Sequence, residues 1–135
     1  MRKLLLAVIL SSGLSGCALI DAYLMAGFDP NEYQMITVIR VEAERSKAQC
    51  FDTTVSKMNA QIVSSKTHLF ERYSEEIPRN KNGLSAAKSL NEIAQGLVVR
   101  YNGTQPVSAA FCKLKFESIE SSAKLMQHVI GNRPR

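Results

Sequence analysis

The sequence predicts an all-α protein in which a long first helix continues into a three-helix bundle stapled by one disulfide. Apolar residues recur at spacings of three, four and seven along most of the chain, which is typical of amphipathic helices. No glycine or proline interrupts residues 31–77, and such an unusually long uninterrupted stretch favours helix. No segment shows the apolar-polar alternation of a half-buried strand.

The N-terminus has the layout of a secretory signal. Arg2 and Lys3 supply positive charge, residues 4–10 are apolar without interruption, and residues 11–16 are mostly small and lead to Cys17. The apolar run is far shorter than the ~20 residues that span a bilayer, so it is not a transmembrane helix. We therefore predict that residues 1–16 are a signal peptide that is removed on export.

Leu14-Ser15-Gly16-Cys17 resembles the lipobox of bacterial lipoproteins at all four positions. The resemblance implies that the Cys17 sulfur receives a diacylglycerol and that the chain is then cleaved before this residue. It also implies that the new amino group receives an acyl chain such as palmitate. Several chains on one residue hold a protein at the bilayer, whereas a single chain binds reversibly. The alternative is an ordinary signal peptide followed by a chance cysteine.

The residue after Cys17 bears on the destination. In Gram-negative lipoproteins similar to this chain, the protein passes to the outer membrane unless Asp follows the cysteine. Ala18 therefore implies the periplasmic face of the outer membrane, with the inner membrane and the cell surface as less favoured alternatives. The lipid bilayer is the first expected partner, and no cofactor is expected beyond the covalent lipid.

Two cysteines remain once Cys17 is acylated. An exported protein with two remaining cysteines usually pairs them, so Cys50 and Cys112 are predicted to form a disulfide. Closing a loop of about 60 residues would stabilise the fold by roughly 4 kcal/mol in the chain-entropy model.

After a lipid-proximal segment, residues 17–29, the first helix is expected to start at Asp29-Pro30, with Asp as the N-cap. It should run to Ile77, because the residue before a proline avoids helical geometry. Threonine and valine weaken helix propensity at residues 53–55, so a kink is expected there. The predicted apolar stripe is Tyr33, Ile36, Ala43, Cys50, Thr54, Ile62, Leu69 and Tyr73.

Two shorter helices complete the prediction. Residues 80–83 form a turn, and a second helix spans about 84–101. After a short loop, Ser108 is the predicted N-cap of a third helix that runs through Ile130 and is ended by Gly131. The expected buried positions of these helices are Ala87, Leu90, Ile93, Ala94, Leu97, Val98, Phe111, Cys112, Phe116, Ile119, Ala123, Met126 and Ile130.

Helix lengths fix the predicted arrangement. Sequential helices joined by short connections pack antiparallel, and a second helix of 18 residues descends by ~27 Å. This brings Cys112 to the level of Cys50. Residues 50–131 are therefore predicted to form the bundle, and residues 30–49 a helical stalk towards the lipid. The stalk would be covered by residues 18–28 folding back, by a second copy of the chain in a homo-oligomer, or by the membrane surface.

Charge is unevenly distributed along the processed chain. Residues 17–77 carry six basic and nine acidic side chains, and residues 78–135 carry nine basic and three acidic ones. The halves are expected to complement each other inside one bundle; the alternative is that the basic half attracts an acidic partner or anionic headgroups. Residues 132–135 form a basic tail, either frayed or in contact with an anionic polymer or a partner. Export argues against nucleic acid as a partner.

Residues suited to catalysis are sparse. His68 and His128 are the only histidines, and the predicted register places them near each other, so they are weak candidates for a metal site. No third ligand is evident and no metal-binding spacing is present, so neither a metal nor a catalytic residue is expected.

The whole pattern resembles small helical lipoproteins encoded by bacteria and, more particularly, by tailed phages. The lipobox, the size and the Cys50/Cys112 pair carry the resemblance. For phage proteins it implies either an outer-membrane subunit of the spanin lysis apparatus or a superinfection-exclusion factor. Such spanin subunits tend to be proline-rich and poorly structured. The bundle region has only two prolines, Pro78 and Pro106, and long predicted helices, which argues against that role. We expect a non-enzymatic protein that binds another envelope component; a small envelope hydrolase or metal-dependent enzyme is the alternative.

Overall fold

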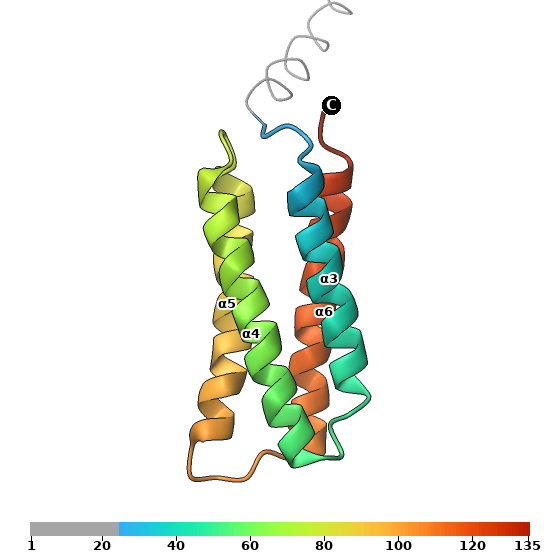
Figure 1. Ribbon diagram of the computed structural model, residues 1–135, viewed down its shortest axis with the longest axis vertical. Helices are drawn as coiled ribbons and strands as arrows, with labels where there is room; N and C mark the ends of the chain where they lie inside the picture. The colour runs from blue at the N-terminus through green and yellow to red at the C-terminus, as the bar shows by residue number, and fades with distance from the viewer. Residues whose placement is uncertain (1–24) are drawn as a thin grey trace, which may run out of the picture.

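The computed structural model describes residues 25–135. They form the helices α3 (Pro30–Lys47), α4 (Thr53–Glu76), α5 (Lys81–Asn102) and α6 (Ala109–Gly131) (Figure 1). This part of the chain contains no strand, so the all-α prediction is confirmed. The predicted signal peptide, Cys17 and the rest of the lipid-proximal segment up to residue 24 lie outside the described residues.

The four helices pack as an antiparallel bundle. α3 packs most extensively against α6, and α4 against α5, while α3–α4 and α5–α6 contacts close the square. Each helix runs opposite to the one before it (Figure 1). Short connections of this kind favour antiparallel neighbours. α4 and α6 therefore occupy one diagonal of the bundle, and α3 and α5 the other.

The predicted continuous first helix is interrupted. α3 ends at Lys47, and Asp52 accepts a hydrogen bond from the Val55 backbone N–H at 3.0 Å as the N-cap of α4. The weak helix formers at residues 53–55 thus mark a new helix start and not a kink. The chain reverses at residues 48–52, and α3 lies along α6 (Figure 1).

The reversal corrects the predicted stalk. Residues 30–49 are one wall of a four-helix bundle, because Ile36, Ile39 and Ala43 are buried in the common core. Burial of these side chains favours packing of α3 against the other helices over a helix that projects into water. It also removes the predicted route to a homo-oligomer through an exposed stalk.

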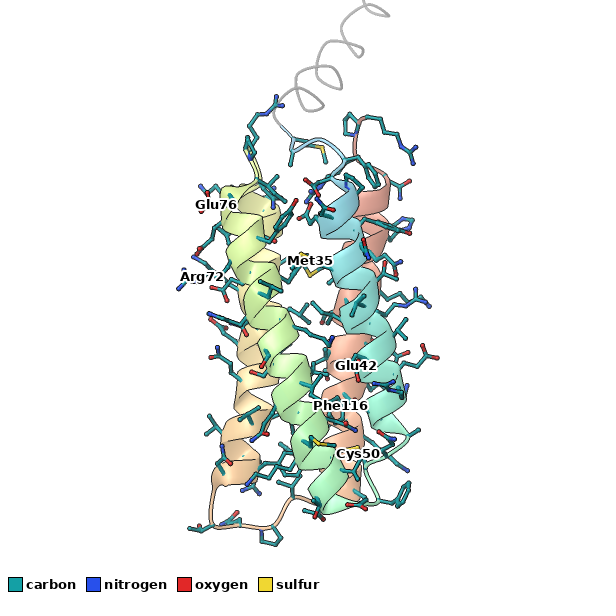
Figure 2. The ribbon with its side chains drawn as sticks, viewed as in Figure 1. Met35, Glu42, Cys50, Arg72, Glu76 and Phe116 are labelled. Atoms are coloured by element: carbon teal, nitrogen blue, oxygen red, sulfur yellow. A yellow bond between two sulfur atoms is a disulfide. The ribbon has the colours of Figure 1, made fainter. Side chains whose placement is uncertain are left out.

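The same interruption changes the buried face of α4. Thr54, Ile62 and Leu69, which a continuous helix would bury, are exposed. The non-helical residues 48–52 reset the helical phase, so the predicted stripe is wrong beyond Cys50. The face turned to the core is Ser56, Asn59, Ala60, Val63, Thr67, Phe70 and Ser74. Figure 2 shows Arg72 and Glu76 directed outwards from α4.

Hydrogen bonds accommodate several polar residues on this face, whereas the buried Ser74 hydroxyl has no partner within residues 25–135. The Thr67 hydroxyl donates to Asn91 Oδ1 on α5 at 3.1 Å, and Asn91 Nδ2 donates to Glu71 Oε2 at 2.6 Å. Near the other end of α4, the Tyr101 hydroxyl donates to Ser56 Oγ at 2.8 Å. Buried polar groups need such partners, so these contacts fix which faces of α4 and α5 meet.

The disulfide between Cys50 and Cys112 is confirmed. Its Cα atoms are 5.7 Å apart, and it spans 62 residues of sequence. It joins the α3–α4 turn to the first turns of α6 at one end of the bundle (Figure 2). The predicted core of α5 and α6 is also confirmed, with Ile93, Val98 and Phe111 half-buried and the other positions fully buried.

The helices in residues 25–135 lack the combination of length and apolar character that a membrane-spanning segment requires.

Candidate functional site

Both ends of the described chain meet at the end of the bundle opposite the disulfide (Figure 1). The Phe28 backbone N–H donates to the Pro134 carbonyl at 2.8 Å, and the Arg135 guanidinium lies 4.9 Å from the centroid of the Phe28 ring. Phe28 also packs on Tyr33, with ring centroids 5.9 Å apart. The basic tail therefore holds the segment that leads towards Cys17, and it is not frayed.

A buried ion pair lies beneath this contact. Glu32 is fully buried and Arg133 is 7% exposed, and Arg133 Nη1 donates to Glu32 Oε2. Arg133 Nη2 donates to Asn80 Oδ1 at 2.8 Å, and Asn80 Nδ2 donates to Glu32 Oε1 at 3.2 Å and to the Ser74 carbonyl at 3.3 Å. The three side chains thus join the start of α3, the α4–α5 turn and the C-terminal tail.

Burial dominates the electrostatics of Glu32. Removal of its carboxylate from water raises its pKa above the usual 4.5, and the nearby Arg133 guanidinium and the Asn80 amide offset only part of this effect. A buried carboxylate of this kind depends on its counter-ion, because unpaired charge in a protein interior is strongly unfavourable.

A second set of hydrogen bonds ties α4 to the start of α3. The Tyr73 hydroxyl lies 3.1 Å from both carboxylate oxygens of Asp29, to which it donates, and it accepts from Asn31 Nδ2 at 3.3 Å. Asp29 Oδ1 also accepts from the Glu32 backbone N–H at 2.8 Å, which caps α3. The predicted Asp29 N-cap is confirmed.

The N-terminus of α5 faces this network without a side-chain cap. Asn80 occupies the N-cap position, but its side chain is engaged with Glu32 and Arg133 and does not bond the helix. The first turn of α5 contains no acidic residue. No N-cap side chain therefore accepts from the first backbone N–H groups of α5, and no acidic side chain in its first turn faces the positive end of the helix dipole.

Gly83 allows the network to lie against this turn. A Cβ atom there would be 2.1 Å from Asn80 Oδ1 and 2.8 Å from Arg133 Nη2. No side chain larger than hydrogen fits while these two residues keep their positions.

A cavity of about 480 Å³ opens beside the network. One wall comes from α6 and one from the start of α5, and the first described residues close the third side. Its lining residues, none of which is acidic, are Met25, Ala26, Arg79, Asn80, Lys81, Asn82, Gly83, Ala86, Leu125, Met126, Val129, Ile130 and Arg133.

The two histidines do not form a site. His68 lies on α4 and His128 on α6, which occupy a diagonal of the bundle, and both side chains are exposed. His128 lies instead beside Asn132, whose Nδ2 is 3.4 Å from the ring nitrogens. The expected proximity assumed a three-helix bundle, and insertion of α3 as a fourth helix separates the two. Within residues 25–135, no three His, Cys, Asp or Glu side chains gather as metal ligands.

Sequence reasoning missed Glu32, Asn80 and Arg133 as a unit. A signal for Glu32 was present, because it precedes Ile36 by four residues and Ile39 by seven and so lies on the buried stripe of α3. No comparable pattern marks Asn80 or Arg133, which lie outside helices and meet Glu32 only through the tertiary fold.

Comparison with protein-family models, with curated proteins and with solved structures finds no significant match for this chain.

Proposed function

We propose that this chain is a lipid-anchored, non-enzymatic protein of the periplasmic face of the outer membrane that acts by binding another envelope component. The observation that carries the proposal is the lipobox-like Leu14-Ser15-Gly16-Cys17 at the end of a signal-like segment. The Cys50–Cys112 disulfide supports export, since such bonds persist in oxidising compartments and are rare in the cytosol.

The position of the first described residue gives the proposal an orientation. Met25 lies eight positions after Cys17, a distance of at most about 28 Å for a fully extended chain. An acylated Cys17 would therefore keep the end with the Glu32–Arg133 pair close to the bilayer. The disulfide end would lie farther out by the length of α4, which is about 36 Å for its 24 residues.

The disulfide end offers a contact for a partner. Phe51 is 82% exposed in the α3–α4 turn, next to the disulfide-bonded Cys50. Aromatic side chains are enriched among the residues that dominate binding energy at protein interfaces. Phe51 is thus held on a stapled turn at the end expected to point away from the membrane, and we propose it as part of the partner-binding surface.

Site-specific photocrosslinking in intact cells tests this proposal. A photoreactive amino acid in place of Phe51 should give a discrete adduct of higher mass, whose second protein is identified by mass spectrometry. Leu69 is a matched control, because it is 62% exposed but lies on the side of α4. An adduct of equal yield at both positions, or none at position 51, would overturn the proposed surface.

A further inference from the structure

We propose that the cavity beside the Glu32–Asn80–Arg133 network binds an anionic phospholipid of the bilayer. The headgroup of the lipid and the adjoining part of one acyl chain would occupy the cavity. The inference rests on the proposed function in one respect, since the anchor is what brings the cavity to the bilayer. The cavity volume of about 480 Å³ lies within the range of ~300–1,000 Å³ typical of small-molecule sites.

The walls suit an acyl chain. α6 contributes Leu125, Met126 and Val129, and Met25 closes the side from which the chain leads to Cys17. Leu125 is 66% exposed, Val129 47% and Met25 45%. Three large apolar side chains that line the same cavity are therefore open to water. An acyl chain lying in the cavity would cover them, which is favourable in proportion to the apolar area removed from water.

The rim suits an anionic headgroup. Lys81 lines the cavity together with Arg79 and Arg133, each of which also has another interaction, and no acidic side chain lines it. The uncapped first turn of α5 adds backbone N–H donors and the positive end of a helix dipole. Phosphate oxygens are acceptors for both kinds of donor.

The backbone at the rim is held in an uncommon conformation. Arg79 has φ of 60°, in the left-handed region that disfavours residues other than glycine. Such conformations persist where the surrounding structure determines them, and they cluster at ligand sites. Here the conformation belongs to the residue that follows Pro78 and lines the cavity.

These features distinguish a phospholipid from the other occupants of an apolar cavity. A second copy of the chain would have to present an acidic apolar surface, and a soluble ligand would gain nothing from the proximity of the anchor. A phospholipid supplies the acidic group and the apolar chain in one molecule, and the bilayer supplies it at high local concentration.

Photolabelling of the processed lipoprotein in vesicles tests the inference. The vesicles are made of phosphatidylcholine with a trace of phosphatidylglycerol that carries a diazirine on one acyl chain, or with the matching phosphatidylcholine probe. Mass spectrometry should place adducts on residues 79–86 and 125–133, and the anionic probe should label them severalfold more than the zwitterionic one. Equal labelling by both probes, or adducts spread over all four helices, would overturn the proposal.

Matched variants sharpen the test. Leu125→Gln removes an apolar side chain from the wall and Lys81→Gln removes a positive charge from the rim, and each should lower the labelling of residues 79–86 severalfold. Leu114→Gln on α6, at a residue 60% exposed, and Lys88→Gln on α5 lie outside the cavity and should leave labelling unchanged. Equal effects of the cavity and control variants would contradict the site.

Intact mass and flotation with the vesicles separate this inference from the proposed function. A protein without acyl chains that does not float would overturn the anchor. An acylated protein that floats but carries no adducts at the cavity would leave the anchor intact and overturn the lipid site. Crosslinks between two copies at residues 125–133 would show that a second chain covers the cavity, and they too would overturn it.

Discussion

Glu32 and Arg133 form an ion pair inside the bundle although 101 residues separate them along the chain. One belongs to the first turn of α3 and the other to the tail after α6. Through Asn80 the pair also reaches the α4–α5 turn. The disulfide closes the opposite end, so each end of the bundle is held by a contact between segments that are distant in sequence.

Loss of the cation should destabilise the bundle strongly. Arg133→Met leaves the Glu32 carboxylate buried without its counter-ion, and we expect a loss of about 3–5 kcal/mol in the free energy of unfolding, measured by urea denaturation. Arg135→Met is the matched control in the same tail and should cost less than about 1 kcal/mol.

The double variant Glu32→Leu/Arg133→Met tests the cause. Replacement of both charges by apolar groups should recover most of the stability lost in Arg133→Met, because no unpaired charge remains. A double variant as unstable as the single one would mean that the geometry of the tail, and not the buried charge, sets the loss.

The direction of the Glu32 pKa predicts a pH dependence. Its pKa in the folded state is above the usual 4.5, so between these two values the folded protein holds more protons than the unfolded chain. The stabilising contribution of Glu32 is therefore full below about pH 4.5 and is lost as the pH rises through the folded-state pKa. The difference in unfolding free energy between the wild type and Glu32→Gln should fall over this window. A difference that rises with pH would contradict the sign.

Two glycines of α5 should respond in opposite directions. Gly83→Ala places a methyl group 2.1 Å from Asn80 Oδ1 and displaces the Asn80–Arg133 contact, which should cost about 1–3 kcal/mol. Gly96→Ala meets no atom within 4 Å and should stabilise the protein by about 0.5–1 kcal/mol through helix propensity. Thermal denaturation of both variants gives the comparison, and equal shifts would refute the close contact at Gly83.

Much of the fold can be predicted from the sequence, because apolar periodicity and helix caps are set by residues close together in the chain. α5 and α6 carry regular apolar stripes, and Ser108 accepts from the Phe111 backbone N–H at 3.1 Å as the predicted N-cap. The cysteine pairing followed from the expected export, and the folded bundle brings both residues to one level.

The reversal between α3 and α4 did not follow, because it is marked by weak signals. Asp52 is an N-cap residue, but it stands between two segments that each have a helical pattern, with no glycine or proline to separate them. The phase of α4 depends on that reversal. Exposed Ile62 and Leu69 and buried Asn59 and Thr67 show that apolar periodicity alone would choose the wrong face.

The network at the candidate site depends on tertiary contacts and not on local pattern. Asn80 and Arg133 are polar residues outside helices, a context in which a sequence predicts exposure. Only the meeting of the start of α3 and the C-terminal tail with the α4–α5 turn buries them.

The central claim is that Cys17 carries the lipid that places this bundle at the membrane, and fatty-acid labelling tests it most directly. Cells that express the wild type are grown with an alkyne fatty acid and separated into membrane and soluble fractions. The double variant Cys50→Ala/Cys112→Ala is the control, because it keeps Cys17. We expect the wild type and the control to be labelled and membrane-bound at the processed size, and Cys17→Ser to be unlabelled and either unprocessed or released. A Cys17→Ser protein that remains labelled and membrane-bound at the processed size would contradict the claim.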